Sequence, residues 1–219
     1  NAGFGATATA LINASGYTTA SVDLTEQWNG SSWTEVADLG TASSTEGQVS
    51  SGDQTSAMAA AGTQGPSRGG ADNAQLWNGS SWSDSSELNT EASGRGGSGT
   101  GTGAFVFGGS TNSATGGIGN SELFNGSAWT EVNDLNVPVG ASGSTGSSNT
   151  AAIVFGGQGP SVPSDRIQIW NGTSWSMGNN MNTARHDLAG AGNSSTDALA
   201  FGGRGPGSSW FTSTEEWRG

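Results

Sequence analysis

The hexapeptide "WNGSSW" occupies residues 28–33 and occurs again, letter for letter, at 77–82. Close variants follow as "FNGSAW" at 124–129 and "WNGTSW" at 170–175, and "WRG" stands at 217–219. The aromatic residue that opens each copy lies at 28, 77, 124, 170 and 217, so the spacings are 49, 47, 46 and 47 residues. Periods of this size are typical of proteins built from repeated supersecondary units, each of which buries its apolar face against a neighbour.

A second marker, an apolar stretch that ends in two small residues, repeats with the same period. It reads "TALINAS" at 9–15, "AMAAAG" at 57–62, "AFVFGG" at 104–109, "AIVFGG" at 152–157 and "ALAFGG" at 198–203. Because two independent markers keep one period, we predict a single domain over residues 1–219 with five structural repeats. The predicted repeats are approximately 1–46, 47–93, 94–139, 140–186 and 187–219.

The composition favours strands over helices. The 219 residues include 39 Gly, 9 Trp and no Cys. The apolar runs are short, rich in β-branched or aromatic residues, and bounded by Gly, Ser and Asn, and none shows the 3.6-residue period of a helix. Tryptophans that keep a regular spacing argue against a disordered chain. No run approaches the roughly 18 apolar residues of a membrane-spanning helix, so we expect no membrane insertion.

Each repeat contains four short segments that resemble strands. The best examples are "DLAGAG" at 187–192, "DALAFGG" at 197–203, "STEEW" at 213–217 and "SSWTEVADL" at 31–39. Four strands joined by tight turns in about 47 residues predict one up-and-down blade of a β-propeller. The first strands consist of small residues and are expected to be innermost. The fourth strands carry acidic residues, which protect an outer edge from pairing with other molecules.

The order of these markers resembles the kelch repeat. An apolar strand ending in Gly-Gly, an acidic strand ending in an aromatic residue, a further Trp and a connection such as "MNTAR" (181–185) follow one another as in that family. The resemblance covers the whole chain and implies a kelch-like propeller. Two features depart from it: Trp-Asn replaces the family's Tyr-Asp, and five blades are fewer than kelch propellers usually have. Degenerate repeats of this type also look like those of marine bacteriophage proteins.

The hexapeptide itself admits three roles: a glycosylation acceptor, a hairpin turn, or a pair of aromatic rings that stack on a sugar. We favour the turn, with Asn and Gly both at positive φ in a type I′ hairpin. A two-residue turn and a four-residue loop both place the two aromatic rings in contact on one face. Trp33→Ala and Trp82→Ala are each expected to cost about 3–5 kcal/mol if these side chains are buried. The residues assigned to structural packing are Trp28, Trp33, Trp77, Trp82, Phe124, Trp129, Trp170, Trp175 and Trp217.

A ligand-binding face is expected opposite the Asn-Gly turns. There the long, variable loops between second and third strands lie beside the connections between blades, and loops on a rigid scaffold commonly carry binding residues. Arg and Trp are enriched at binding hot spots. The candidate residues on this face are Tyr17, Arg68, Arg166, Arg185, Arg204, Trp210 and Phe211.

Catalytic groups are scarce in the sequence. With no Cys and a single His, zinc sites and Cys-His chemistry are excluded, and a copper-radical oxidase would lack its ligands. A formal charge of −12 opposes binding to nucleic acid, which rests on neutralising phosphates. We therefore expect no catalytic residues, no metal and no cofactor.

These observations lead to three functional hypotheses. The first is a non-enzymatic structural or receptor-binding propeller of an extracellular particle, such as a phage tail or capsid appendage, located outside the cell or on the virion surface. The second is a lectin-like module that binds glycans, and the third is a protein-interaction scaffold. The expected partners are other subunits of a particle or fibre, or a cell-surface glycan or protein.

The number of strands leads to a prediction about closure. Five first, five second and five third strands can be counted, but only four outer strands. We therefore predict an all-β, five-bladed kelch-like propeller of four-stranded antiparallel blades, in which the fifth blade lacks its outer strand and no blade position is vacant. Residues 213–217 are expected to form an open edge, completed by polypeptide outside this sequence or by a neighbouring subunit, including a second copy.

Overall fold

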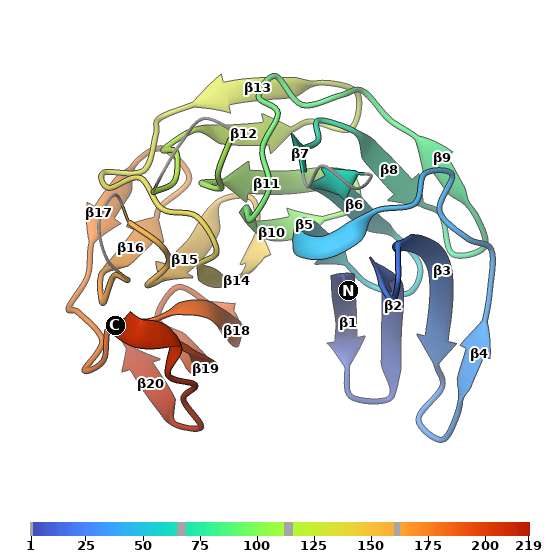
Figure 1. Ribbon diagram of the computed structural model, residues 1–219. Coiled ribbons are helices and arrows are strands. Elements are labelled where there is room, and N and C mark those ends of the chain that lie inside the picture. The colour runs from blue at the N-terminus through green and yellow to red at the C-terminus, as the bar shows by residue number, and fades with distance from the viewer. Residues whose placement is uncertain (1, 65–68, 112–115, 160–162) are drawn as a thin grey trace.

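The computed structural model describes residues 2–64, 69–111, 116–159 and 163–219, which form five antiparallel sheets in chain order (Figure 1). Each predicted repeat supplies one sheet. Sheet 1 contains β1 (Ala2–Thr7), β2 (Ala10–Tyr17), β3 (Ser21–Trp28) and β4 (Trp33–Glu35), and sheet 2 contains β5 (Ser44–Gly52), β6 (Ala57–Gln64), β7 (Gly69–Gly70), β8 (Ala74–Trp77) and β9 (Trp82–Asp84). Sheet 3 contains β10 (Gly96–Thr100), β11 (Gly103–Phe107), β12 (Ser121–Phe124) and β13 (Trp129–Val132). Sheet 4 contains β14 (Gly143–Ser148), β15 (Ala151–Phe155), β16 (Ile167–Trp170) and β17 (Trp175–Met177), and sheet 5 contains β18 (His186–Ser194), β19 (Asp197–Arg204) and β20 (Thr214–Arg218).

The first strand of each sheet lies on the inside of the molecule. β1, β5, β10, β14 and β18 pack on one another in this order, and the sheets extend outward from them around an arc (Figure 1). Small residues are needed here because the backbones approach closely: a Cβ on Gly190 of β18 would lie only 2.6 Å from the carbonyl oxygen of Ser144 in β14. The prediction that the small-residue strands are innermost is confirmed.

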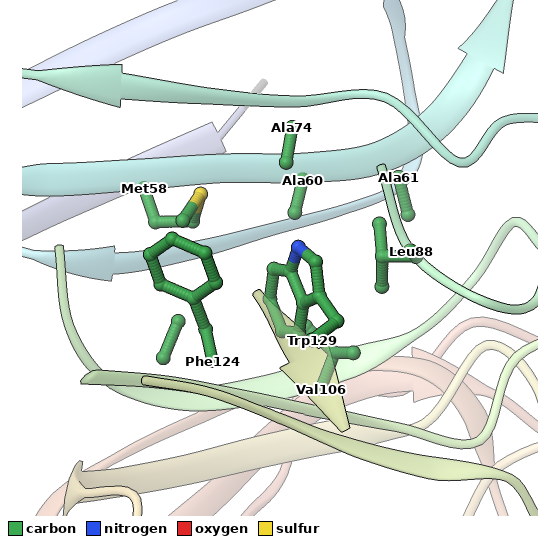
Figure 2. Packing of buried hydrophobic residues seen from close by; sticks show 9 residues of the cluster. Met58, Ala60, Ala61, Ala74, Leu88, Val106, Phe124 and Trp129 are labelled. Atoms are coloured by element: carbon green, nitrogen blue, oxygen red, sulfur yellow. The ribbon is translucent and has the colours of Figure 1, made fainter. Parts of the chain in front are cut away.

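The hydrophobic core is divided into layers between neighbouring sheets. Figure 2 shows the layer between sheets 2 and 3, where Met58 and Ala60 of β6 meet Val106, Phe124 and Trp129 of sheet 3. All five residues are buried. Each sheet therefore depends on its neighbours for much of its apolar burial, as expected of a repeat architecture.

The aromatic residues of each hexapeptide face one another directly. Trp170 pairs with Trp175 across β16 and β17, and their ring centroids lie 5.4 Å apart. The same pairing at 28/33, 77/82 and 124/129 gives centroid distances of 5.6, 5.3 and 5.1 Å. The loop between the strands therefore has four residues, which was one of the two alternatives, and the predicted aromatic contact is confirmed.

The turn itself differs from the predicted type I′ hairpin. Gly172 has φ of 93°, but Asn171 is not among the residues with positive φ. Instead, Asn171 Oδ1 accepts the backbone N–H groups of Thr173 and Ser174, both at 2.9 Å. The Asn carboxamide thus takes the place of a backbone acceptor, as in an Asx-turn, so this residue does not need a left-handed conformation.

Replacing Asn171 by Ala is expected to lower the free energy of unfolding by about 1 kcal/mol, because two backbone N–H groups lose their acceptor. Asn171→Asp retains an acceptor oxygen at the same place and should change stability little. Urea unfolding of both variants checks this. Equal losses in the two variants would show that the carboxamide oxygen is not what holds the turn.

The two small residues of the second marker mark a sharp change of chain direction. Gly108 and Gly109 have φ of 63° and 104°, and the corresponding pair in sheet 1 is Ser15 and Gly16, with φ of 61° and 150°. The Gly109 N–H donates to the carbonyl of Val139, in the connection that leaves the same sheet. In sheet 1 the marker therefore ends at Gly16, one residue later than the sequence pattern indicated.

The five sheets do not close into a ring. No packing comparable to that between the other first strands joins β18 to β1 in the described part of the chain, and the arc stays open between sheets 5 and 1 (Figure 1). The prediction that no position is vacant is therefore wrong. Among the described residues β20 pairs only with β19, so the predicted open edge along the third strand of sheet 5 is confirmed.

The open arc changes the expected role of Trp33. Its side chain is 46% exposed, whereas Trp129 and Trp175, at the same position of later sheets, are buried. Trp82 is partly buried. The expected loss of about 3–5 kcal/mol on replacing a buried tryptophan by alanine does not apply to Trp33, because no preceding sheet covers it.

Candidate functional site

The hexapeptide turns gather at one end of the sheets, together with the turns between first and second strands. The indole N–H groups of Trp77, Trp170 and Trp217 donate to the carbonyls of the latter turns. These bonds reach Gln54 at 2.8 Å, Asn149 at 3.1 Å and Ser195 at 3.0 Å. The loops that follow the second strands therefore lie at the opposite end, as the sequence predicted.

At that opposite end the loop between β19 and β20, residues 205–213, is held by backbone hydrogen bonds. The chain leaves β19 at Arg204, passes through the 3-10 turn η1 (Pro206–Ser208) and returns at Trp210, which forms an isolated bridge with Arg204. The Gly205 N–H donates to the carbonyl of Ser209 at 2.9 Å. These bonds hold the loop in a defined shape next to the sheet.

Trp210, Arg204 and Asp187 form one surface cluster, here named the Trp210 platform. Trp210 is 73% exposed, and the guanidinium carbon of Arg204 lies 5.1 Å from the centroid of its ring. Arg204 Nε donates to Asp187 Oδ2 at 2.8 Å, and a second guanidinium nitrogen contacts the same oxygen. His186 Nδ1 lies 3.1 Å from that oxygen. The platform combines an apolar ring face with a cation and a carboxylate.

The carboxylate is fixed at the boundary between sheets 4 and 5. Asp187 has φ of 53°, a left-handed conformation that Asp tolerates better than most residues. Its N–H donates to the carbonyl of Ala141 at 2.8 Å. Ala141 itself has φ of 50° and donates to the carbonyl of Gly94. The position of Asp187 is therefore set by a hydrogen-bonded series that links three neighbouring sheets.

Beneath the platform, Arg185 is buried and has a structural role. Its guanidinium donates to the carbonyls of Gly202 and Ser213 at 3.0 and 3.1 Å, and to Glu215 Oε1 at 2.5 Å. It also lies 5.2 Å from the ring centroid of Phe211. Phe211 is partly buried and supports the loop from below. The prediction that Arg185 belongs to a ligand-binding surface is corrected by this burial.

The remaining candidates do not join the platform. Tyr17 is exposed, but it ends β2 in sheet 1. Arg166 is exposed just before β16 in sheet 4, and among the described residues it does not contact the platform. Arg68 lies outside the described residues. The structure thus brings together Arg204, Trp210 and Phe211 from the predicted set, over the buried Arg185.

Sequence reasoning did not select Asp187 or His186 as parts of a site. A signal was available, because both follow Arg185 directly and are the first two residues of β18. The described residues include no group of three or more His, Cys, Asp or Glu side chains placed to hold a metal ion. In the same part of the chain no helix is long and apolar enough to cross a membrane.

No protein-family model matches this sequence, and no curated protein matches it. The kelch resemblance therefore rests on the order of the residues in the repeat. The structure establishes an all-β chain of five successive antiparallel sheets.

Proposed function

We propose that this chain is a non-enzymatic recognition module, and that the Trp210 platform is its contact surface. The observation that carries the proposal is that Trp210 is 73% exposed while the guanidinium of Arg204 lies over its ring. The loop that presents Trp210 is held in place by backbone hydrogen bonds. Large aromatic residues and arginines supply most of the binding energy at recognition surfaces. A fixed platform also loses little side-chain freedom when a ligand binds.

The platform suits a ligand that has both an apolar face and hydroxyl groups. The indole ring offers a flat apolar surface, Asp187 offers acceptor oxygens, and Arg204 offers guanidinium donors. A sugar ring has this combination, with C–H groups on one face and hydroxyls at its rim. We therefore favour a glycan as the ligand, and receptor binding by an extracellular particle, such as a phage tail or capsid appendage, as the setting.

We also propose that the five sheets are blades of a kelch-like propeller. Three observations support this: the sheets follow one another in chain order, the small-residue strands lie inside, and a period near 47 residues recurs. In a propeller the loops at one end form a common surface. The Trp210 platform would then lie on that surface, opposite the hexapeptide turns.

Trp210→Ala is expected to abolish binding on a glycan array while leaving the melting temperature within about 2 °C, because an exposed side chain contributes little to stability. The matched control is Trp33→Ala, which removes another exposed tryptophan at the far end of the arc and should leave binding unchanged. Loss of binding in both variants would contradict a role for the platform. Wild-type protein that binds no glycan on the array would contradict the ligand class.

A further inference from the structure

The interfaces between neighbouring sheets share one plan, which is clearest between sheets 3 and 4. Phe105 and Phe107 of β11 project toward sheet 4, where the ring centroids of Phe105 and Trp170 lie 4.9 Å apart and those of Phe107 and Trp175 lie 5.0 Å apart. The indole N–H of Trp175 donates to Ser121 Oγ of β12 at 3.1 Å. We name the side with the second-strand apolar pair the front face and the side with the paired aromatics the back face.

A polar bond recurs across the same interfaces. In sheets 2 to 5, a Gln or Glu stands two residues before the first aromatic residue of the repeat motif and accepts a backbone N–H from the connection that leaves the preceding sheet. These bonds are Gly40 to Gln75 at 2.9 Å, Asn89 to Glu122 at 2.7 Å, Val137 to Gln168 at 3.0 Å and Asn182 to Glu215 at 2.6 Å. The back faces of sheets 2 to 5 thus each hold the connection of the sheet before them.

Among the residues that the structure describes, no sheet packs on the front face of sheet 5. The strand pairing makes Leu199 and Phe201 the counterparts of Ile153 and Phe155. Leu199 and Phe201 are 40% and 38% exposed, whereas Ile153 and Phe155 are fully buried by the next sheet. Thr214, at the position of the hydroxyl that accepts an indole N–H between sheets 3 and 4, is exposed as well.

The back face of sheet 1 is uncovered in the complementary way. Trp33 is 46% exposed, and its indole N–H makes no hydrogen bond to any residue that the structure describes. Glu26, the counterpart of the buried Glu122, is exposed and holds no connection from a preceding sheet in the described chain. The two ends of the arc therefore carry the two halves of the interface that recurs between its sheets.

We propose that one further sheet of this repeat type packs between the front face of sheet 5 and the back face of sheet 1 and closes the arc. Terminal units of repeat proteins normally carry polar outer faces. Here one end face exposes Leu199 and Phe201 beside the polar Thr214 and Glu216, and the other exposes Trp33 beside Glu26. The closing sheet covers Leu199 and Phe201 with its tryptophans and covers Trp33 with its own apolar pair. Its connection provides the backbone N–H for Glu26.

The sheet comes from a polypeptide segment outside residues 1–219 rather than from a second copy of this chain. A second copy that placed its sheet 5 on sheet 1 would leave Glu26 without a partner, because sheet 5 has neither an outer strand nor the connection that follows one. A net charge of −12 on each copy also opposes self-association. A complete further repeat covers the front face of sheet 5 and also brings a connection whose backbone N–H can bond to Glu26 of sheet 1.

The test compares the 219-residue chain with an extended chain. The extension follows Gly219 and has two parts. A copy of residues 173–219 supplies the outer strand of sheet 5 and the first three strands of a sixth sheet. A copy of residues 173–185 then supplies the outer strand of the sixth sheet and the connection after it. Phe201→Ser and Trp33→Ser probe the two end faces. Phe155→Ser is the matched control, because Phe155 lies between sheets 4 and 5 in both proteins.

In the 219-residue chain we expect Phe155→Ser to lower the melting temperature by on the order of 10 °C. Phe201→Ser and Trp33→Ser should lower it much less in that chain, because both residues are already exposed. In the extended chain all three substitutions should lower it by similar amounts. The proposal is overturned if either end-face substitution in the extended chain has no larger effect than in the 219-residue chain.

Sedimentation velocity of the 219-residue chain distinguishes a closing sheet supplied by a separate polypeptide segment from one provided by a second copy of the chain. We expect a monomer at every concentration that stays soluble. A concentration-dependent oligomer that dissociates on Phe201→Ser would show that a second copy covers the end face, and this would also overturn the proposal.

Discussion

Trp170→Ala is expected to lower the free energy of unfolding by about 3–5 kcal/mol, the range for removing a large aromatic side chain from a packed core. The Trp170 side chain is fully buried, stacks near Phe105 and Trp175, and donates its indole N–H to the carbonyl of Asn149 at 3.1 Å. The alanine variant therefore loses apolar contacts on two sheets and one hydrogen bond. Equilibrium unfolding in urea measures the loss.

Trp33→Ala is the matched control for this substitution. It belongs to the same motif and also faces a partner ring, Trp28, at 5.6 Å. Because its outer side is uncovered, we expect a loss of only about 1 kcal/mol. Similar losses in the two variants would show that sheet 1 is covered as completely as sheet 4.

Glu122→Ala is expected to cost about 3–5 kcal/mol as well, because it removes one partner of a buried ion pair. Glu122 accepts the backbone N–H groups of Asn89 and Thr90 at 2.7 and 3.1 Å, and its carboxylate lies 3.3 Å from Arg95. Burial lowers the pKa of the Arg95 guanidinium, and the Glu122 charge opposes that shift. Without the carboxylate, Arg95 is left as a buried cation that has lost its ion-pair partner.

The double variant Glu122→Gln with Arg95→Met separates the two contributions. Gln occupies the same position in sheets 2 and 4, where Gln168 accepts the N–H of Val137 and donates to its carbonyl. The double variant keeps an acceptor for the connection and removes the unpaired charge, so it should be more stable than Glu122→Ala. A double variant that is less stable than Glu122→Ala would contradict this account.

The repeated sheets could be predicted because their signals are local. The Asn-Gly hexapeptide fixes a hairpin, and the apolar stretch that ends in two small residues fixes a strand and the change of direction after it. The Asn side chain escaped prediction because a carboxamide acceptor and a left-handed backbone are alternative ways to make the same turn. The Gln and Glu residues that bind the connections can be read in the sequence. Their role could not be predicted, because a polar residue on a strand is ordinarily expected to face solvent.

Closure could not be predicted because it depends on the angle between neighbouring sheets. That angle is set by how the side chains between two sheets, such as Phe105 and Trp170, fill their layer, and a count of strands does not contain it. The candidate site shows a similar limit. Arg204 and Trp210 could be selected as loop residues, but nothing in the amino-acid sequence distinguishes the buried Arg185 from an exposed arginine.

The five sheets form an open arc whose two uncovered end faces expose Leu199 and Phe201 on sheet 5 and Trp33 on sheet 1. Hydroxyl-radical labelling of the dilute 219-residue chain, read by mass spectrometry, tests this arrangement most directly. We predict strong labelling of Leu199, Phe201 and Trp33, with Ile153 and Phe155 protected as buried counterparts. Equal protection of Leu199 and Phe201 with Ile153 and Phe155 would contradict the open arc.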